Sequence, residues 1–575
     1  MPHKPYRLIF NNDGGTLFRP FAPASDVPFS TKGFVDATLG YLEDTHVDAV
    51  SWTLGTDIWP MPDIQGAGRA TNFYSHKTSV GERFDEIESP YHARSWHVMA
   101  DRVRTMIENG DDPPRVLADA AHRKGLDFFL SVRMNDAHDG RIVERNRVPL
   151  FGSKPPVGKP VFENGVFNDH NIRGHICKMK LDHPEWLIGD HESLTRVATI
   201  AFDYAHKPVR DFRLALIEEA IEQYDIDGIE LDFLRHPLLF KPGEERKHAH
   251  LMTEFIGAVR AALDRVSSIR VKHLRLSVRT LLPLEASQRI GLDVDEWLRE
   301  GFIDIWIGGI VDRTRLELRE AVDLAAQYDC PVYASFKTDA ILGRGHHHPE
   351  AFRAIAANHY RAGVSGIYLF NMTAYRYRWL AGQNPPDGLG LDYDYQPLRE
   401  IGSFDAIRLE NKHYIFDNKG SGHRTDVTTF MEWSPEMQDR LLISEWGTTI
   451  DKPVIPTHLQ QGESVETILR IADDPAEARS ADKRLFLTLR LMLTDMTGGS
   501  HILTVRWNEY EPPPQMLEGE SSYQVDLELP SSHLICGDNA MKISLESGDP
   551  SVLSELRIDD VEVISKYVEG SDTNE

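Results

Sequence analysis

Two carboxylates spaced two residues apart are the side chains of this chain best suited to chemistry. Glu230 and Asp232 lie in the segment DGIELDFLRHP, residues 227–237. Because side chains alternate between the two faces of a strand, both carboxylates share one face if this segment is a β-strand. Such a pair suits glycosidic cleavage, since one ionised carboxylate stabilises positive charge at the anomeric carbon while a neighbour of raised pKa donates a proton. The alternative is structural, with either carboxylate buried as the ion-pair partner of Arg133 or Arg279.

Basic residues end several other apolar runs with the same spacing. Arg133, Arg279 and Lys337 each follow a serine by two residues, so each shares a strand face with it. Arginine presents a bidentate fork to carboxylate and sulfate groups, so three such cations predict an anionic sugar as substrate. The predicted substrate contacts are Asn12, Asp13, Trp52, Arg133, His138, Arg235, His236, Arg279, Lys337 and Asn371.

The segment RMNDAHD, residues 133–139, supplies a further carboxylate. Asp136 is the predicted second carboxylate of the site, with Asp139 as the spare and His138 between them. These residue types also form ordinary turns, which is the alternative interpretation. Several aromatic residues are candidates for stacking on sugar, because an aromatic ring suits the apolar face of a sugar ring. Core packing is the alternative for each of them. The candidate stacking platforms are Trp52, Trp59, Trp306 and Tyr375.

Eight short apolar runs, alternating with amphipathic helical stretches, are expected to position these residues. This alternation is typical of parallel βα units, and eight is the strand number of a (β/α)8 TIM barrel, which gathers its chemistry at the carboxyl ends of its strands. Helices are predicted between Pro113 and Gly125 and over residues 208–224. The predicted strands cover residues 7–12, 47–53, 126–133, 226–232, 274–279, 303–309, 331–337 and 366–371.

The pattern changes after residue 405 to closely spaced short strands separated by turn residues, with one further helix around Pro475 to Ser480. This pattern is typical of an antiparallel β-sandwich. The sequence therefore predicts a barrel over residues 1–404, a sandwich over 405–568 and a polar tail over 569–575, with the boundary between about Gly402 and Lys412.

The segment DGIELDFLRHP resembles the DGI-x-L-D-x-x-R-x-P signature of glycosyl-hydrolase-like family 10 barrel proteins. It is also similar to the DG-x-D-x-D-x-E strand of family 18 chitinases. Asp227, Glu230 and Asp232 fall on the three acidic positions of that strand, but Leu234 occupies the position of the chitinase catalytic glutamate. The resemblance implies a carbohydrate-active barrel without the chitinase mechanism. Residues 529–545, LPSSHLICGDNAMKISL, resemble jelly-roll domains attached to β-galactosidases, which implies support of the barrel or sugar binding, with support preferred.

The composition argues against several other classes of protein. With 63 basic and 89 acidic residues, the net charge of −26 argues against nucleic acid or an anionic membrane as partner. Three cysteines without a CxxC pair predict neither a disulfide framework nor a zinc site. The histidine run at residues 346–348 lacks a metal-ligand spacing, so no metal and no cofactor is expected. The sequence shows no leader-like segment, which predicts a cytoplasmic location, and it leaves the oligomeric state open.

These observations favour a glycosidase acting on a poly- or oligosaccharide that carries uronate or sulfate groups. Asp232 would be the nucleophile or charge stabiliser, with Glu230 or Asp136 as the acid/base. One alternative is a lyase or sugar isomerase on the same barrel, in which Lys337 or His138 abstracts a proton next to a uronate carboxylate. The other is a carbohydrate-binding protein without catalysis. The barrel fold alone does not decide among a glycosidase, a lyase or isomerase, and a binding protein.

Overall fold

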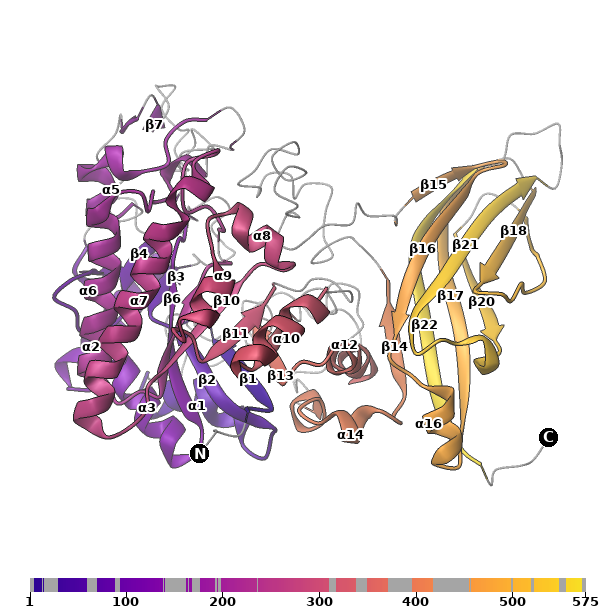
Figure 1. Cartoon of the computed structure of the whole chain (residues 1–575), viewed down its shortest axis with the longest axis horizontal. Coiled ribbons are helices and arrows are strands. Elements are labelled where there is room, and N and C mark those ends of the chain that lie inside the picture. Colours follow the sequence, from indigo (N-terminus) through magenta and orange to yellow (C-terminus); the bar gives the residue numbers. More distant parts are fainter. Residues whose placement is uncertain are drawn as a thin grey trace.

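The structure is a computed structural model of the whole chain, viewed in Figure 1. The residues that it describes are 5–12, 14, 29–58, 70–87, 94–137, 139, 162–163, 165–167, 176–191, 194, 198–234, 236–309, 317–337, 349–370, 396–416, 455, 457–497, 500–518, 522–547 and 555–570.

Eight parallel strands close into a barrel in the order β1-β13-β12-β11-β10-β9-β6-β2. All eight strands predicted from the sequence are present, each within two residues of its predicted ends, so the (β/α)8 prediction is confirmed. The barrel strands are β1 (Leu8–Asn12), β2 (Val47–Thr53), β6 (Asp127–Arg133), β9 (Gly228–Asp232), β10 (Arg275–Thr280), β11 (Ile305–Gly308), β12 (Val332–Lys337) and β13 (Gly366–Phe370).

Helices cover the outside of the barrel (Figure 1). The two helices predicted by their end signals and apolar face are present. Pro113 and Pro114 occupy the first turn of α3, where proline loses no hydrogen bond, and α6 buries the apolar face predicted within residues 208–224. The helices are α1 (Thr31–Leu39), α2 (Arg94–Glu108), α3 (Pro113–Arg123), α5 (Lys178–Asp182), α6 (Lys207–Gln223), α7 (Glu245–Arg270), α8 (Leu284–Arg289), α9 (Val294–Arg299), α10 (Arg319–Ala325), α12 (Pro349–Arg361) and α14 (Phe404–Ile407).

The stretches after the second and third barrel strands contain small sheets within the described residues. One sheet has the order β3-β4-β5 and the other pairs β7 with β8. The sequence indicates long rim segments here, but it gives no strand signal strong enough to predict these elements. The strands are β3 (Gly55–Ile58), β4 (Ala70–Tyr74), β5 (Glu82–Arg83), β7 (Phe162–Glu163) and β8 (Val166–Phe167).

The C-terminal part is an antiparallel β-sandwich, as the sequence predicts. One sheet has the order β14-β22-β17-β20, with β15 also on β22, and the other has the order β16-β21-β18-β19. Buried and exposed residues alternate along β17, which places one face of each sheet in a shared apolar core. The strands are β14 (Lys412–Ile415), β15 (Thr457–Gln460), β16 (Ser464–Ile471), β17 (Lys483–Thr497), β18 (Ser500–Trp507), β19 (Gln515–Glu518), β20 (Tyr523–Leu529), β21 (Gly537–Ser547) and β22 (Glu555–Glu569).

The elements predicted for the sandwich agree with the structure in part. The predicted helix near residue 475 is present as α16 (Pro475–Ser480). Among the short runs after residue 405, RLLISEW (440–446) also has the pattern of a strand, but it lies outside the described residues, whereas β15 and β19 are strands that the pattern does not predict. The domain boundary near residues 402–412 stays a prediction. No helix among the described residues is long and apolar enough to cross a membrane.

Helix α12 contributes to both hydrophobic cores and lies between the barrel and the sandwich (Figure 1). Asn358 donates from Nδ2 to the carbonyl of Arg470 at 3.0 Å, and Arg361 donates from Nε to the carbonyl of Ala472 at 3.1 Å. The Arg361 guanidinium also pairs with Glu477 of α16 at 2.7 Å. The sandwich is therefore fixed to a helix of the barrel by directional contacts.

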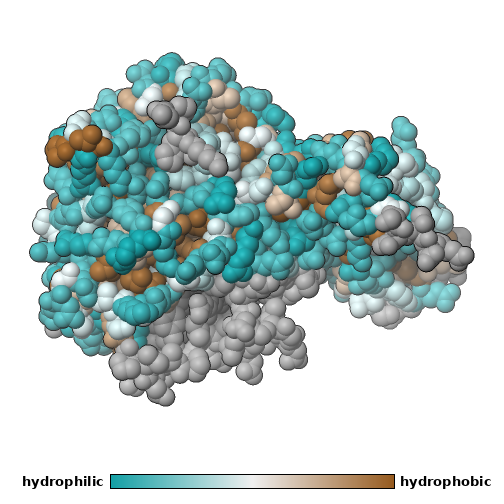
Figure 2. Space-filling view, turned by 90° about the horizontal axis from the view of Figure 1, so that it is seen from below, coloured by the Kyte–Doolittle hydropathy of each residue, from teal (hydrophilic) through white to brown (hydrophobic). Residues whose placement is uncertain are grey.

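The surface seen in Figure 2 is largely hydrophilic, with scattered hydrophobic residues. Among the exposed apolar residues, Val271 is 92% exposed and ends α7 with φ of 53°. A β-branched residue in the left-handed region is strained, by about 1–2 kcal/mol. Its backbone N–H still donates to the carbonyl of Ser267, a bond that needs no side chain.

We expect Val271→Gly to raise the free energy of unfolding by about 1 kcal/mol, because glycine adopts this conformation without strain. Urea unfolding of the purified protein measures the change. Ile269→Gly is the matched control: Ile269 is 76% exposed and lies two residues earlier within α7. Glycine there lowers stability, because the position is helical. A loss of stability at both positions would contradict the strain assigned to Val271.

Candidate active site

Polar side chains fill the upper part of the barrel interior, beyond an apolar layer. On the neighbouring strands β6, β9 and β10, the register aligns Ser131, Glu230 and Ser277 in one row. Two residues further along each strand, it aligns Arg133, Asp232 and Arg279 in the next row. Each serine thus shares the interior face with the charged residue two positions later, as the spacing predicts. The apolar layer consists of Tyr6, Ile9, Ala49, Phe129, Ile305, Ile307, Tyr333, Tyr368 and Phe370.

Glu230 is held by three hydroxyl groups from three other strands. Ser51 donates to Oε2 at 2.8 Å, while Ser131 and Tyr368 donate to Oε1 at 2.6 and 2.9 Å. The side chain is buried, and this burial together with the charge of Asp232 raises the pKa of the Glu230 carboxyl. Glu230 is therefore a hydrogen-bonded carboxyl below the barrel mouth. Its direct contacts are hydroxyl groups, and not Arg133 or Arg279 as in the structural alternative.

Asp232 forms a buried ion pair with Arg279. Arg279 Nη1 lies 2.8 Å from Asp232 Oδ2, and the backbone N–H of Leu234 donates to Oδ1 at 3.0 Å. The Arg279 guanidinium lies over the Phe370 ring at 3.9 Å from its centroid. Among the described residues, Nε and Nη2 of Arg279 have no hydrogen-bond acceptor, although the side chain is fully buried. Asp232 thus has a fixed cationic neighbour, and that neighbour keeps donors for a ligand.

Asp136 lies on the segment that follows β6, between a cation and an imidazole. Arg133 donates from Nη1 to Asp136 Oδ2 at 2.9 Å, and His236 Nδ1 lies 3.7 Å from Oδ1. The backbone N–H of Ala137 donates to the same Nδ1 at 3.1 Å, so the proton of the neutral ring is on Nε2. His236 has φ of 108°, a strained conformation of the kind that gathers at functional sites.

Buried polar contacts hold the segment that carries Asp136. Asn135 donates from Nδ2 to the carbonyls of Phe202 and Leu238 at 2.8 and 2.5 Å, and its Oδ1 accepts from the N–H of Phe202 at 3.0 Å. Asp139, the spare carboxylate, pairs with Lys180 at 2.9 Å with both side chains fully buried. Asp139 therefore anchors this segment, which leaves Asp136 as its candidate reactive carboxylate.

Two predicted contacts lie on the wrong face of their strands. Trp52 is the register partner of Asn12, while Ser51, on the opposite face of β2, reaches Glu230 inside the barrel. Trp52 is fully buried in the layer between barrel and helices. Asn12 accepts from the N–H of Gly14 at 3.0 Å and stabilises the turn after β1. Trp52 and Asn12 therefore point away from the barrel interior, and the structure does not bring them together with the polar residues around Glu230.

Trp306 is also a core residue rather than a stacking platform. It is fully buried in the outer layer, and its Nε1 donates to Thr280 Oγ1 at 2.8 Å. Several predicted site residues lie outside the described residues, and for Lys337 only the backbone, in β12, is described. Those outside are Asp13, Trp59, His138, Arg235, Asn371, Tyr375 and the histidines at 346–348.

Ser51 and Tyr368 are site residues that the sequence analysis missed. Both lie on predicted strands, at positions whose face the alternation rule gives once one interior residue is known. Each lies two residues before the end of its strand, below the position at which barrel enzymes usually place reactive side chains.

The two described arginines of the mouth are each paired with one of its candidate carboxylates. Arg133 pairs with Asp136 and Arg279 with Asp232, so these four side chains together are neutral. Such pairs hold the two carboxylates in a fixed orientation. Among the described residues, no group of three or more His, Cys, Asp or Glu side chains is arranged to hold a metal ion.

No family model matches the chain, and no curated protein matches it. Solved structures similar to it include alpha-L-fucosidase isoenzyme 2 from Paenibacillus thiaminolyticus, at 12% identity and a TM-score of 0.36, covering 69% of this chain and 48% of that one. The PgaB (BpsB) glycoside hydrolase domain from Bordetella bronchiseptica has 11% identity and a TM-score of 0.34, covering 66% and 99%. The GH36 alpha-galactosidase AgaA from Geobacillus stearothermophilus has 12% identity and a TM-score of 0.32, covering 94% and 55%. This chain thus spans about half the length of the fucosidase and the galactosidase, and these similarities are too remote to transfer an activity to it.

Proposed function

We propose that this chain is a glycoside hydrolase with its active site at the carboxyl ends of the barrel strands. The observation that carries the proposal is the Asp232 carboxylate, which ends β9 beside Arg279 and shares its strand face with Glu230. Asp232 is the nucleophile or the stabiliser of the positive charge that develops at the anomeric carbon. Its ion pair with Arg279 holds the carboxylate in one orientation at the strand end.

Asp136 is the proposed acid/base, and Glu230 supports Asp232 from below. Both oxygens of Glu230 already accept hydroxyl hydrogen bonds inside the barrel, which leaves this carboxyl poorly placed to reach a glycosidic oxygen. Asp136 lies beyond the end of β6, beside the His236 imidazole. We also propose that the barrel is related to glycosyl-hydrolase-like family 10 proteins and that the sandwich is a jelly-roll-like support, on the residue patterns given above.

The proposed substrate carries uronate or sulfate groups. Arg279 supports this proposal, because its Nε and Nη2 are buried donors without an acceptor among the described residues. A buried donor left unpaired costs about 1–3 kcal/mol, which a bidentate anion would remove. Because the four paired side chains have no net charge, the support for an anionic group comes from the unpaired donors of Arg279 and not from a positive pocket.

We expect Arg279→Lys to weaken binding of an anionic oligosaccharide by about 1–3 kcal/mol, because lysine keeps the charge beside Asp232 and loses the planar fork. Titration calorimetry with an oligogalacturonide measures the change, with thermal unfolding as the control for folding. A neutral oligosaccharide of equal length should bind both proteins alike. If neutral glycans are bound and processed better than charged ones, the arginines are structural and the anionic preference is wrong.

The test of the proposed function is a screen against uronate-rich and sulfated polysaccharides, with neutral polysaccharides alongside. Each reaction is followed by new reducing ends and by near-ultraviolet absorbance. A hydrolase releases reducing ends without absorbance, whereas a lyase produces both, because elimination leaves an unsaturated uronate. Sugar binding without either signal would identify a carbohydrate-binding protein and overturn the proposal.

A further inference from the structure

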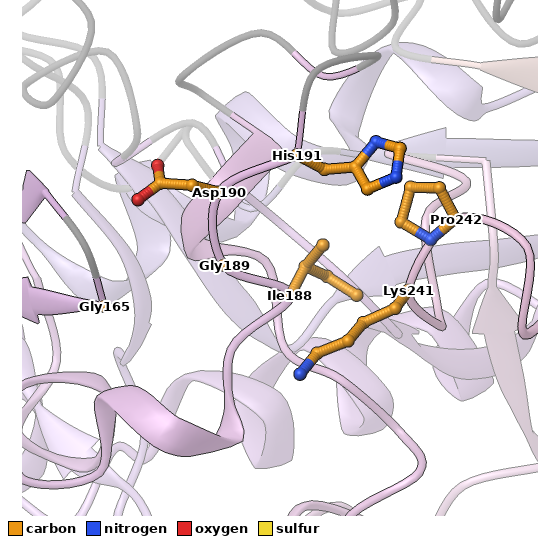
Figure 3. Close-up of a pocket in the computed structure, with 7 residues that line it drawn as sticks. All are labelled: Gly165, Ile188, Gly189, Asp190, His191, Lys241 and Pro242. Atoms are coloured by element: carbon orange, nitrogen blue, oxygen red, sulfur yellow. The ribbon is translucent and has the colours of Figure 1, made fainter.

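A cavity lies on the rim of the barrel, and its lining contains none of the candidate carboxylates of the mouth. Figure 3 shows its walls, which come from the segment after β6 and from the segment after β9. Its volume is about 350 Å³, at the lower end of the range of about 300–1,000 Å³ typical of small-molecule sites. The lining residues are Gly165, Ile188, Gly189, Asp190, His191, Lys241 and Pro242.

One wall of this cavity is tied to the segment that carries Asp136. The backbone N–H groups of Ile188 and Gly189 donate to residues 201 and 199, at 2.9 Å each, which forms a short two-stranded ribbon. The next residue along that ribbon, Phe202, exchanges two hydrogen bonds with the Asn135 side chain. This wall is thus hydrogen-bonded to Asn135, the residue that precedes the proposed acid/base Asp136.

The other wall is tied to the same side chain. Asn135 also donates to the carbonyl of Leu238, three residues before Lys241, and the N–H of Tyr204 donates to the carbonyl of Leu239 at 2.8 Å. Both walls therefore converge on Asn135, which places the cavity on the flank of the proposed active site.

The side chains of the cavity combine an apolar surface with hydrogen-bond donors. In Figure 3, Lys241 and His191 lie on either side of Ile188, Pro242 lies beside His191, and the Asp190 carboxylate points away from Lys241. No salt bridge of Lys241 is found among the described residues, and its charge acts on the buried Asp203 carboxyl, where it partly offsets the burial that raises the pKa of that group. An apolar surface flanked by an ammonium group fits a sugar ring, which has an apolar C–H face and, in a uronate, a carboxylate.

We propose that this cavity is a secondary subsite that binds one anionic sugar unit of the same chain whose bond is cleaved at the barrel mouth. The inference rests on the proposed function and deepens it, because it makes the substrate an oligo- or polysaccharide that spans both sites. Lys241 binds the carboxylate or sulfate of that unit, and the apolar surface of Ile188 and Pro242 contacts its ring. Lys241 takes no part in the chemical step.

Titration calorimetry with oligogalacturonides of increasing length tests the subsite without requiring turnover. In the unmodified protein we expect affinity to rise with length, as the longer chains reach the cavity. We expect Lys241→Gln to lower the affinity for the long chains about twofold to fivefold, the range for an ion pair on an accessible lysine, and Lys241→Glu to lower it further. Affinity for the shortest bound oligomer should not change.

Lys247→Gln is the matched control, because Lys247 is an exposed lysine on the adjacent α7 that pairs with Glu244 and does not line the cavity. It removes the same charge and should leave the length dependence intact. Equal length dependence in the unmodified protein and in both Lys241 variants would overturn the subsite, and so would a failure of every oligomer to bind. Binding that depends on length and on Lys241, but without any bond cleavage, would uphold the subsite and overturn the hydrolase proposal instead.

Discussion

Asp232→Asn should lower turnover by about three orders of magnitude or more, with ligand affinity largely kept. The asparagine keeps the size of the side chain and the acceptor for the N–H of Leu234, but it removes the negative charge. A carboxylate that stabilises developing positive charge, or attacks it, acts mainly in the transition state, so its loss appears in kcat rather than in KM.

The same substitution also affects stability, because Arg279 then remains buried without its counter-charge. Removing one partner of a buried ion pair costs about 3–5 kcal/mol. Turnover must therefore be expressed per folded molecule, with the folded fraction taken from urea unfolding of the same preparation.

The double variant Asp232→Asn with Arg279→Met separates the two effects. Replacing both charges removes the lone buried cation, so stability should recover toward the original value while turnover stays low. Near-normal turnover of the Asp232→Asn variant would remove this residue from the mechanism. Asp136→Asn would then be the substitution to measure, since Asp136 is the other carboxylate held at the mouth.

Lys412→Met should lower the free energy of unfolding by about 3–5 kcal/mol without changing turnover per folded molecule. Lys412 Nζ donates to Asp473 Oδ1 at 2.7 Å and to the carbonyls of Arg408 and Glu410 at 3.0 and 2.9 Å, and both charged side chains are fully buried. The Tyr567 hydroxyl also donates to Asp473, at 2.9 Å. This cluster joins the segment before β14 to the sandwich, and losing the amine leaves a buried carboxylate without its cation.

Two further variants make this prediction specific. Lys412→Met with Asp473→Leu should regain much of the lost stability, because neither charge then stays buried alone. Lys542→Met breaks the exposed pair with Glu466, at 2.8 Å, and should cost less than about 1 kcal/mol. Equal losses at Lys412 and Lys542 in urea unfolding would show that the buried pair has no special weight.

The barrel could be predicted from the sequence because its strands are short, apolar and separated by helices with clear ends. The alternation rule also placed Arg133, Asp232 and Arg279 on one interior face, since each lies two residues after another interior residue. Local patterns of this kind depend only on neighbours along the chain.

The site contacts that the sequence missed depend on residues far apart in the chain. The alternation rule does not say which of two adjacent residues faces inward, so Trp52 was chosen where Ser51 reaches Glu230 across 179 positions. The pairing of Arg279 with Asp232 is one of the structural alternatives that the sequence leaves open, whereas the pairing of Arg133 with Asp136 is not among them, since several carboxylates lie within reach of each arginine. Strand register and side-chain packing determine which residue faces inward and which ion pairs form.

The shared helix α12 has a consequence for how such a protein can change over evolutionary time. Ala354 belongs to the core of the sandwich, while its neighbours Phe352 and Ile355 belong to the core of the barrel. One helix therefore has to satisfy two packing environments at once. Exchanging the sandwich for another accessory domain would leave part of α12 without a partner, so such an exchange would also require changes in α12 itself.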